Sequence, residues 1–213
     1  MIQNFIDTRR IEPQAKDNGF SRTYGLSDSF VIMYAGNIGI PHGVEVLVHT
    51  AHILRGQRDI LFCFVARGEY KDQIQALAAE KKLDNVLFIE PQPERYVPQI
   101  WASASVGAIT YRRQLADFSV PSKLLACMCA QRPVLPAADD NSATSKLIAK
   151  AGCGVVVPPE SPQTLAETIV WMKAHPLDLQ EMAANGRRYA TKHLRKEAIV
   201  DRYESLFQEV ASS

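Results

Sequence analysis

The sequence predicts an α/β fold, a doubly wound parallel sheet of six strands with additional helices at the carboxyl end. Short apolar runs without a polar face recur along the chain, as is typical of strands that are covered by helices on both sides. Stretches with helical spacing separate these runs, and this alternation indicates parallel strands joined by right-handed crossovers. The expected strands are 31–35, 60–65, 86–89, 106–110, 133–135 and 154–157.

The helices are indicated by apolar residues that recur every three or four positions. The residues that share one face of the first helix are Val44, Leu47, Val48, Ala51 and Leu54. Comparable faces follow within 74–78, 124–128 and 147–148. Beyond about residue 163 the pattern is wholly helical, and the helices expected there are 163–175, 178–192 and 196–210.

The length of 213 residues favours one substantial domain. The first 27 residues show no clear period and contain Pro13, Gly19 and Gly25. Residues 1–27 are therefore expected to be an interdomain linker and a lead-in to the sheet, and residues 28–213 a Rossmann-like domain.

The overall charge gives no reason to expect a nucleic-acid partner. The 24 Lys and Arg nearly balance the 23 Asp and Glu, so any anion site must be local. The sequence has no apolar stretch of membrane-spanning length and no signal-peptide pattern, which favours a cytoplasmic location. The four cysteines lack the C-x-x-C spacing and are expected to be buried thiols rather than metal ligands.

The turn after the first strand is a candidate ligand site. Residues 36–43 read GNIGIPHG, and glycines allow close approach of a ligand to the backbone, while a helix start presents unpaired N–H groups to a phosphate. The turn matches neither the dinucleotide-binding nor the P-loop pattern, so a plain strand-to-helix turn is the alternative. His42 is a candidate donor or cation, or else an exposed loop residue.

The helix start Pro121-Ser122-Lys123 is the second candidate. A lysine in the first turn opposes the helix dipole, and a bound phosphate would reverse the sign of that interaction. The alternative is a solvated surface lysine. Asp139-Asp140 resembles an acidic metal-binding pair, but it follows a short strand and is interpreted as a polar loop. Arg112, Arg113 and Asp117 lie in the loop after the fourth strand, at the carboxyl edge of the sheet, where ligands bind. The residues alone thus predict a phosphate-bearing ligand at that edge.

Several short segments follow the order and spacing of a known family. These segments are 4–7 with Pro13, 34–39, 62–69, 85–89, 121–125, 132–134 and 151–154 leading to Pro158. Through them the chain, from Asn4 to about Val210, resembles the C-terminal half of the family-4, or group 1, retaining glycosyltransferases of the GT-B fold. The resemblance is strongest to the subgroup that makes bacterial exopolysaccharide and O-antigen.

The resemblance implies that residues 28–213 bind a nucleotide diphosphate sugar, without a metal or a cofactor. It implies the donor half of a hexosyltransferase-type enzyme, which transfers a sugar to a glycan or a lipid-linked acceptor with retention at the anomeric carbon. The donor-binding residues that it implies are Gly36, Asn37, Gly39, His42, Arg67, Gly68, Ile89, Ser122 and Lys123.

Two departures from the family leave alternatives open. The family's two glutamates would fall near Phe118 and at Ala126, and neither position is acidic. The second glutamate normally holds the ribose hydroxyls, and Asp117 is the only candidate to replace the first, so no catalytic residue is otherwise assigned. The alternatives are a degenerate nucleotide-binding or interaction domain without transferase activity, or another GT-B member such as a sugar-nucleotide epimerase.

The resemblance also implies a partner. An N-terminal acceptor-binding domain, on a separate or longer chain, would complete the enzyme and would make any contact with the inner membrane. Without that domain, apolar surface is expected to be uncovered, and a weak homodimer could then form.

Overall fold

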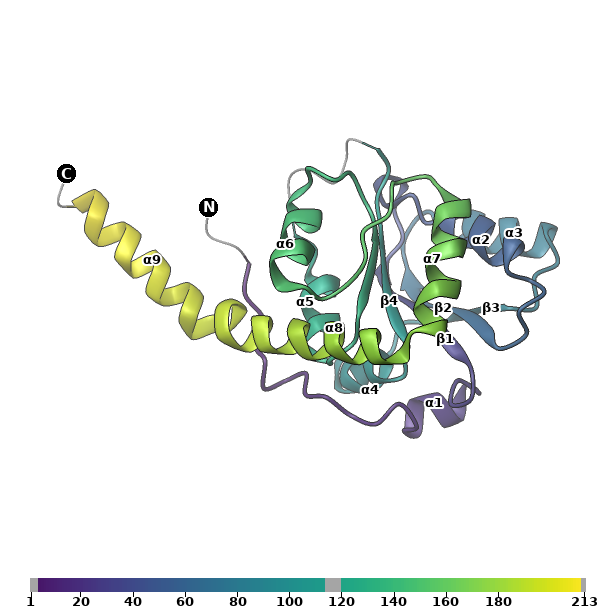
Figure 1. The fold of residues 1–213 in the computed structure, drawn as a ribbon, viewed down its shortest axis with the longest axis horizontal. Helices are drawn as coiled ribbons and strands as arrows, with labels where there is room; N and C mark the ends of the chain where they lie inside the picture. Colours follow the sequence, from purple (N-terminus) through teal and green to yellow (C-terminus); the bar gives the residue numbers. More distant parts are fainter. Residues whose placement is uncertain (1–3, 114–119, 212–213) are drawn as a thin grey trace.

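The computed structural model describes residues 4–113 and 120–211 of the chain (Figure 1). A parallel sheet lies at its centre, in the strand order β3-β2-β1-β4-β5, which confirms the predicted α/β class. The described strands are β1 (Phe30–Asn37), β2 (Ile60–Arg67), β3 (Val86–Ile89), β4 (Val106–Thr110) and β5 (Val134–Ala137). The order reverses between β1 and β4, so the carboxyl ends of these two strands mark the switch point where α/β sheets bind ligands.

The expected sixth strand, 154–157, is not a full strand of the sheet. It runs along β5 and joins it through two isolated bridges, Val134 to Gly154 and Ala137 to Val157. The backbone N–H of Val134 donates to Cys153 and that of Ala138 donates to Val157. Pro136 lies between these two donors and has no N–H, so the ladder is interrupted in its middle. The sheet therefore has five described strands rather than the predicted six.

Helices cover both faces of the sheet (Figure 1). The helices α2 (Glu45–Ile53), α3 (Lys71–Glu80) and α7 (Pro162–Ala174) pack on one face, which includes Ile32 and Tyr34 of β1. On the other face, which includes Val31 and Met33, the helices are α4 (Val97–Ala102), α5 (Ser122–Cys129) and α6 (Ala143–Ala151). Adjacent residues of β1 thus pack on opposite faces of the sheet, as the run of apolar residues without a polar face predicts.

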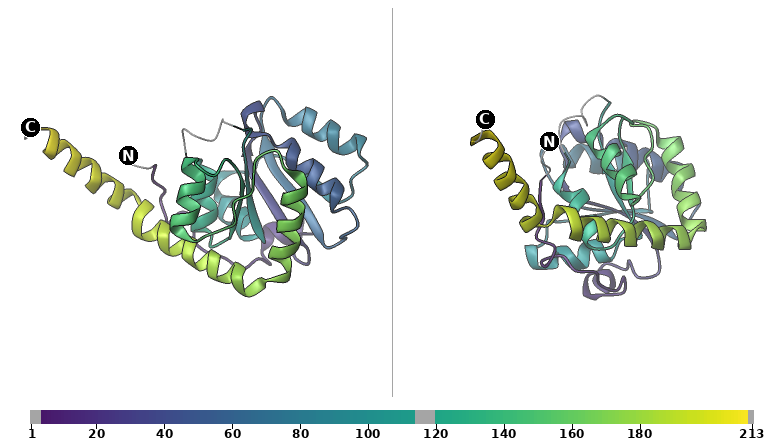
Figure 2. Two further views of the ribbon diagram at one scale, coloured as in Figure 1. Left: turned by 45° about the horizontal axis from the view of Figure 1, so that its top comes forward. Right: turned by 60° about the vertical axis from the view of Figure 1, so that its left-hand side comes forward.

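The carboxyl end of the chain is helical, as predicted. The helix α8 (Pro176–Tyr189) continues through the π-helical turn η3 (Ala190–Leu194) into α9 (Lys196–Ala211). All three views show α9 extending away from the rest of the domain (Figures 1 and 2). Ile199 is its only buried residue among those described, whereas Phe207 and Val210 are 66% and 68% exposed.

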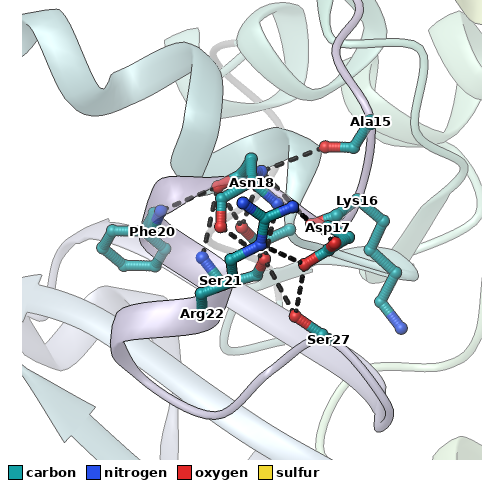
Figure 3. A network of polar contacts seen from close by, with 9 residues as sticks. Ala15, Lys16, Asp17, Asn18, Phe20, Ser21, Arg22 and Ser27 are labelled. Carbon is teal, nitrogen blue, oxygen red and sulfur yellow. Dashed lines mark hydrogen bonds and ion pairs between the residues drawn. The ribbon is translucent and has the colours of Figure 1, made fainter.

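The described part of the expected linker is attached to the domain. The guanidinium of Arg187 donates to the carbonyls of Thr8 and Ile11, and that of Arg132 donates to Gln14. The short helix α1 (Gly19–Thr23) follows, and its N-cap Asn18 accepts the backbone N–H groups of residues 20 and 21 while its amide donates to Ala15 (Figure 3). These contacts fix the path of the segment before β1.

Candidate functional site

A cleft of about 1180 Å³ opens at the carboxyl edge of the sheet. The ends of β1 and β2 and the first turn of α5 form one end of this cleft. The segment 5–11, the short 3₁₀ helix η2 (Glu94–Tyr96) and α4 form the other end. We call these the strand end and the segment end. A cleft at the switch point of a parallel sheet is the expected place for a ligand.

Lys123 lies at the strand end, in the first turn of α5. Its Nζ donates to the hydroxyl of Tyr34 at 2.7 Å and lies 3.9 Å from the centre of the Tyr34 ring. A Cβ added at Gly36 would lie 3.6 Å from the same Nζ, so the amine covers the end of β1. Burial lowers the pKa of Lys123 to about 7. Among the residues that the structure describes, no carboxylate forms an ion pair with this amine.

His42 ends the 3₁₀ turn η1 (Ile40–His42), which follows β1. The backbone N–H of Gly39 donates to its Nδ1 at 2.9 Å, so the neutral ring carries its proton on Nε2 and can donate from there. Burial, and then the charge of Lys123, lowers the pKa of His42. The ring is therefore a neutral donor near pH 7, close to the lysine.

The structure brings together most of the residues predicted to hold the donor. The cleft is lined by Gly36, Asn37, His42, Arg67, Ser122 and Lys123. The other three predicted residues are not among its lining residues. Gly39 orients the imidazole of His42, and the side chain of Ile89 is buried in the core beneath the cleft.

Gly68 has a structural role beside the cleft. Its φ is +129°, and a Cβ there would lie 2.3 Å from the carbonyl oxygen of Ile38. The turns that follow β1 and β2 therefore touch through this glycine. The same contact is held by the backbone N–H of Ile38, which donates to Arg67 at 2.7 Å.

Arg112, another candidate from the sequence analysis, does not line the cleft. Arg112 forms an ion pair with Glu45 at 2.6 Å and donates to the carbonyl of Ile40, so it supports the η1 turn from outside. Asp117 and Phe118 lie outside the described residues. Ala126 lines the cleft on α5, where it presents a methyl group.

The segment end was not predicted as part of the site. It contains Arg10 from the N-terminal segment and Glu94 from η2, which form an ion pair at 3.1 Å. Trp101 and Ile11 supply apolar surface beside them. Apart from 4–7, one of the segments that carry the family resemblance, no local pattern marks these residues, because segments far apart in the chain build this end.

Tyr34 is a further residue that the sequence analysis did not assign to the site. It lies in the middle of a buried strand, where a tyrosine normally serves as core. Its hydroxyl reaches the carboxyl edge of the sheet and donates to the carbonyl of Asn37 at 2.7 Å.

A doubly wound domain with a cleft of this kind at its switch point, followed by a helix that leaves the domain, has the architecture of the C-terminal half of a GT-B protein. The chain belongs to the family described as glycosyl transferases group 1, which it matches over residues 29–175.

Known proteins of similar sequence and fold agree with this assignment. An alpha-D-kanosaminyltransferase of Streptomyces kanamyceticus is 23% identical over 93% of this chain and 50% of its own length. The C-terminal domain of the group 1 glycosyl transferase LpcC of Francisella tularensis has a TM-score of 0.71 and 17% identity, over 90% of this chain and 99% of that chain. HepE of Anabaena, solved with UDP-glucose, has a TM-score of 0.79 and 17% identity, over 100% of this chain and 57% of that chain.

The chain spans about half the length of the curated transferase. In the part of the chain that the structure describes, no helix is both long and apolar enough to cross a membrane.

Proposed function

We propose that this domain binds the nucleotide diphosphate sugar for a retaining hexosyltransferase that acts on a glycan or a lipid-linked acceptor. The observation that carries the proposal is the amine of Lys123, which covers the end of β1 inside the cleft without a carboxylate partner among the described residues. A half-buried amine of this kind is stabilised by an anion. The family membership supports a sugar diphosphate as that anion.

The strand end would serve the transfer by stabilising negative charge. When the bond to the sugar breaks, charge grows on the leaving diphosphate, and donors fixed beforehand at that place lower the barrier. The first-turn N–H groups of α5, the amine of Lys123 and the Nε2–H of His42 are such donors. Arg67, which is exposed at the end of β2, adds a cation. No metal or cofactor enters this proposal.

The second half of the enzyme would come from an acceptor-binding domain on a longer or separate chain. The exposed apolar residues of α9 that need such a cover are Val200, Tyr203, Leu206, Phe207 and Val210. Phe5, which is 45% exposed, lies in the segment end of the cleft. A domain that covered both α9 and Phe5 would close the cleft at its segment end. A weak homodimer through α9 is the alternative cover.

We further place the enzyme in the cytoplasm. All four cysteines are buried free thiols, which suits a reducing compartment.

One observation favours the second candidate, a degenerate nucleotide-binding or interaction domain. Ala126 places a methyl group where the family resemblance implies the carboxylate that holds the ribose. A nucleotide would then bind mainly through its phosphates. Nucleotide affinity separates the proposed function from an interaction domain that binds no nucleotide.

The test is calorimetric titration of UDP, GDP and ADP into the 213-residue chain and into Lys123→Ala. Loss of a hydrogen bond to a charged group costs about 1.5 to 3 kcal/mol, so the variant should bind about 10- to 150-fold more weakly. The matched control is Lys146→Ala, which removes an exposed lysine of α6 and should leave the affinity unchanged. The proposal fails if no nucleotide binds at millimolar concentration, or if Lys123→Ala binds like the parent.

A further inference from the structure

Tyr34 connects the core of the sheet to the strand end of the cleft. Its ring is fully buried on the α2 side of β1 and lies 6.1 Å from the ring of Phe64. Its hydroxyl donates its one proton to the carbonyl of Asn37, so the oxygen is left as an acceptor. Burial raises the pKa of this phenol above its usual value, so it remains neutral.

The oxygen of Tyr34 accepts from Lys123 at 2.7 Å, and this contact joins residues 89 positions apart. The amine is thereby held between the phenol and the end of β1 at Gly36. A flexible lysine side chain normally loses rotamer entropy when a ligand fixes it. Here the contact with Tyr34 already fixes the side chain in the free protein, so binding loses less entropy.

Among the described residues, the groups around the amine leave its charge uncompensated. From β1, Tyr34 is a neutral phenol, and Tyr111 in the loop after β4, which interacts with Tyr34, is a neutral phenol too. From η1, His42 faces Lys123 and is neutral near pH 7. The remaining charged residues that line the cleft are Asp7, Arg10, Arg67, Glu94 and Arg95.

The carboxylates among these cleft residues have other basic partners. Asp7 pairs with Arg9, and Glu94 pairs with Arg10. Burial alone accounts for the lowered pKa of Lys123, which is about 7.

We propose that Tyr34 is a positioning residue that holds the amine of Lys123 at the strand end, and that binding of a diphosphate there favours protonation of this amine. The inference rests on the proposed function, because it requires that the cleft receives a diphosphate. The only change in covalent structure is the proton that solvent supplies to Nζ.

The direction of the pH dependence follows from the proton balance. An anion next to the amine stabilises its charged form and raises the pKa of Lys123 in the complex. Affinity is then highest below pH 7, where the free amine is already charged, and falls as the pH rises toward the pKa of the complex. For a rise of one to two pKa units on binding, the affinity should fall about 6- to 20-fold between pH 6.5 and pH 8.5.

The direct experiment measures proton uptake by calorimetry. UDP-glucose is titrated into the chain at pH 8 in HEPES and in Tris, whose ionisation enthalpies differ, with GDP-glucose and ADP-glucose as further probes. These diphosphates are esterified at both ends, so they lack the ionisation near pH 6 of a terminal phosphate. We expect an uptake of about 0.4 to 0.8 proton per ligand.

Two variants separate a positioning role from a purely structural one. Arginine is charged throughout this pH range, so in Lys123→Arg the uptake should vanish and the affinity should change less than about twofold between pH 6.5 and pH 8.5. Tyr34→Phe removes the acceptor of the amine but keeps the ring. Its binding should be about 3- to 10-fold weaker at pH 8, with a smaller loss at pH 6, because an amine without its acceptor is harder to protonate.

The control for Tyr34→Phe is Tyr203→Phe on α9, far along the chain from the cleft, which should bind like the parent. Should Tyr34→Phe fail to fold, the NMR signal of the Lys123 Cε methylene in the parent provides the second measurement. It should show the shift that a nearby aromatic ring produces and should titrate near pH 7.

The possible results discriminate between the two proposals. Nucleotide-sugar binding without proton uptake, together with a flat pH profile, would overturn the proton coupling and leave the proposed function standing. A loss in Tyr34→Phe that is equal at pH 6 and pH 8, or a Lys123 methylene without a ring-induced shift, would overturn the role of Tyr34. Absence of binding by every nucleotide and nucleotide sugar would instead remove the proposed function itself.

Discussion

The two ends of the cleft are built in different ways. The strand end is made by the last residues of β1 and β2 and the first turn of α5, whose backbones are held by the sheet and by Gly68. The segment end is made by residues 5–11 and η2, which are far apart in the sequence and are joined to each other by an exposed ion pair. The strand end is thus held by backbone contacts between neighbouring strands, whereas the two parts of the segment end are linked by an ion pair between exposed side chains.

The largest effect is expected at the joint that makes the strand end rigid. Gly68→Ala places a Cβ 2.3 Å from the carbonyl oxygen of Ile38 at a φ of +129°. Overpacking and backbone strain together should lower the free energy of unfolding by about 2 to 4 kcal/mol, as measured by urea denaturation.

Gly56→Ala is the matched control for that change, because a Cβ there meets nothing within 4 Å. It should change the free energy of unfolding by less than about 0.5 kcal/mol. Equal stability of the two variants would show that the turns after β1 and β2 are not joined as described.

A second variant tests whether the middle of the cleft can hold a ribose. Ala126 lies three residues after Lys123, so a carboxylate there would be one turn further along the same face of α5. Two charge-assisted hydrogen bonds, less the cost of fixing the side chain, leave a gain of about 1 to 3 kcal/mol. Ala126→Glu should therefore bind UDP about 5- to 150-fold more tightly.

The 2′-deoxy analogue of UDP is the control for that gain, since it lacks one of the two hydroxyls. Its gain in affinity should be smaller. Should Ala126→Glu leave both affinities unchanged, residue 126 does not face the ribose, and the degenerate-domain alternative gains support.

The smallest effect is expected at the segment end. Arg10 and Glu94 have side chains that are 66% and 75% exposed, and an exposed ion pair contributes about 0.2 to 1 kcal/mol. A double-mutant cycle of Arg10→Ala and Glu94→Ala, followed by thermal unfolding, should give a coupling in that range that shrinks in high salt. A coupling above about 2 kcal/mol would mean that the segment end is as rigid as the strand end.

The same contrast explains what could be predicted from the sequence. The strand end follows from local patterns, because a glycine-rich turn after a buried run and a lysine in a first helical turn both lie within a few residues of the element that positions them. The segment end depends on contacts between residues 10 and 94, and the placement of Lys123 depends on Tyr34, 89 residues earlier. A sequence pattern within one helix or strand does not indicate contacts between residues so far apart.

The error in the number of strands has the same origin. An apolar run at 154–157 is a reasonable strand by composition. Pro136 interrupts the hydrogen bonds between β5 and 154–157 because its backbone nitrogen faces that edge of β5. The direction in which this nitrogen faces follows from the pairing of β5 in space.

Pro136 also affects whether the sheet can associate with a strand of another molecule. The unpaired edge of a parallel sheet is a template on which a strand of another molecule can add, and this is a common route to aggregation. At β5 that edge is occupied by residues 153–157 of the same chain, and a partner that displaced them would still find no N–H at position 136. On this side the sheet is closed to the addition of a further strand.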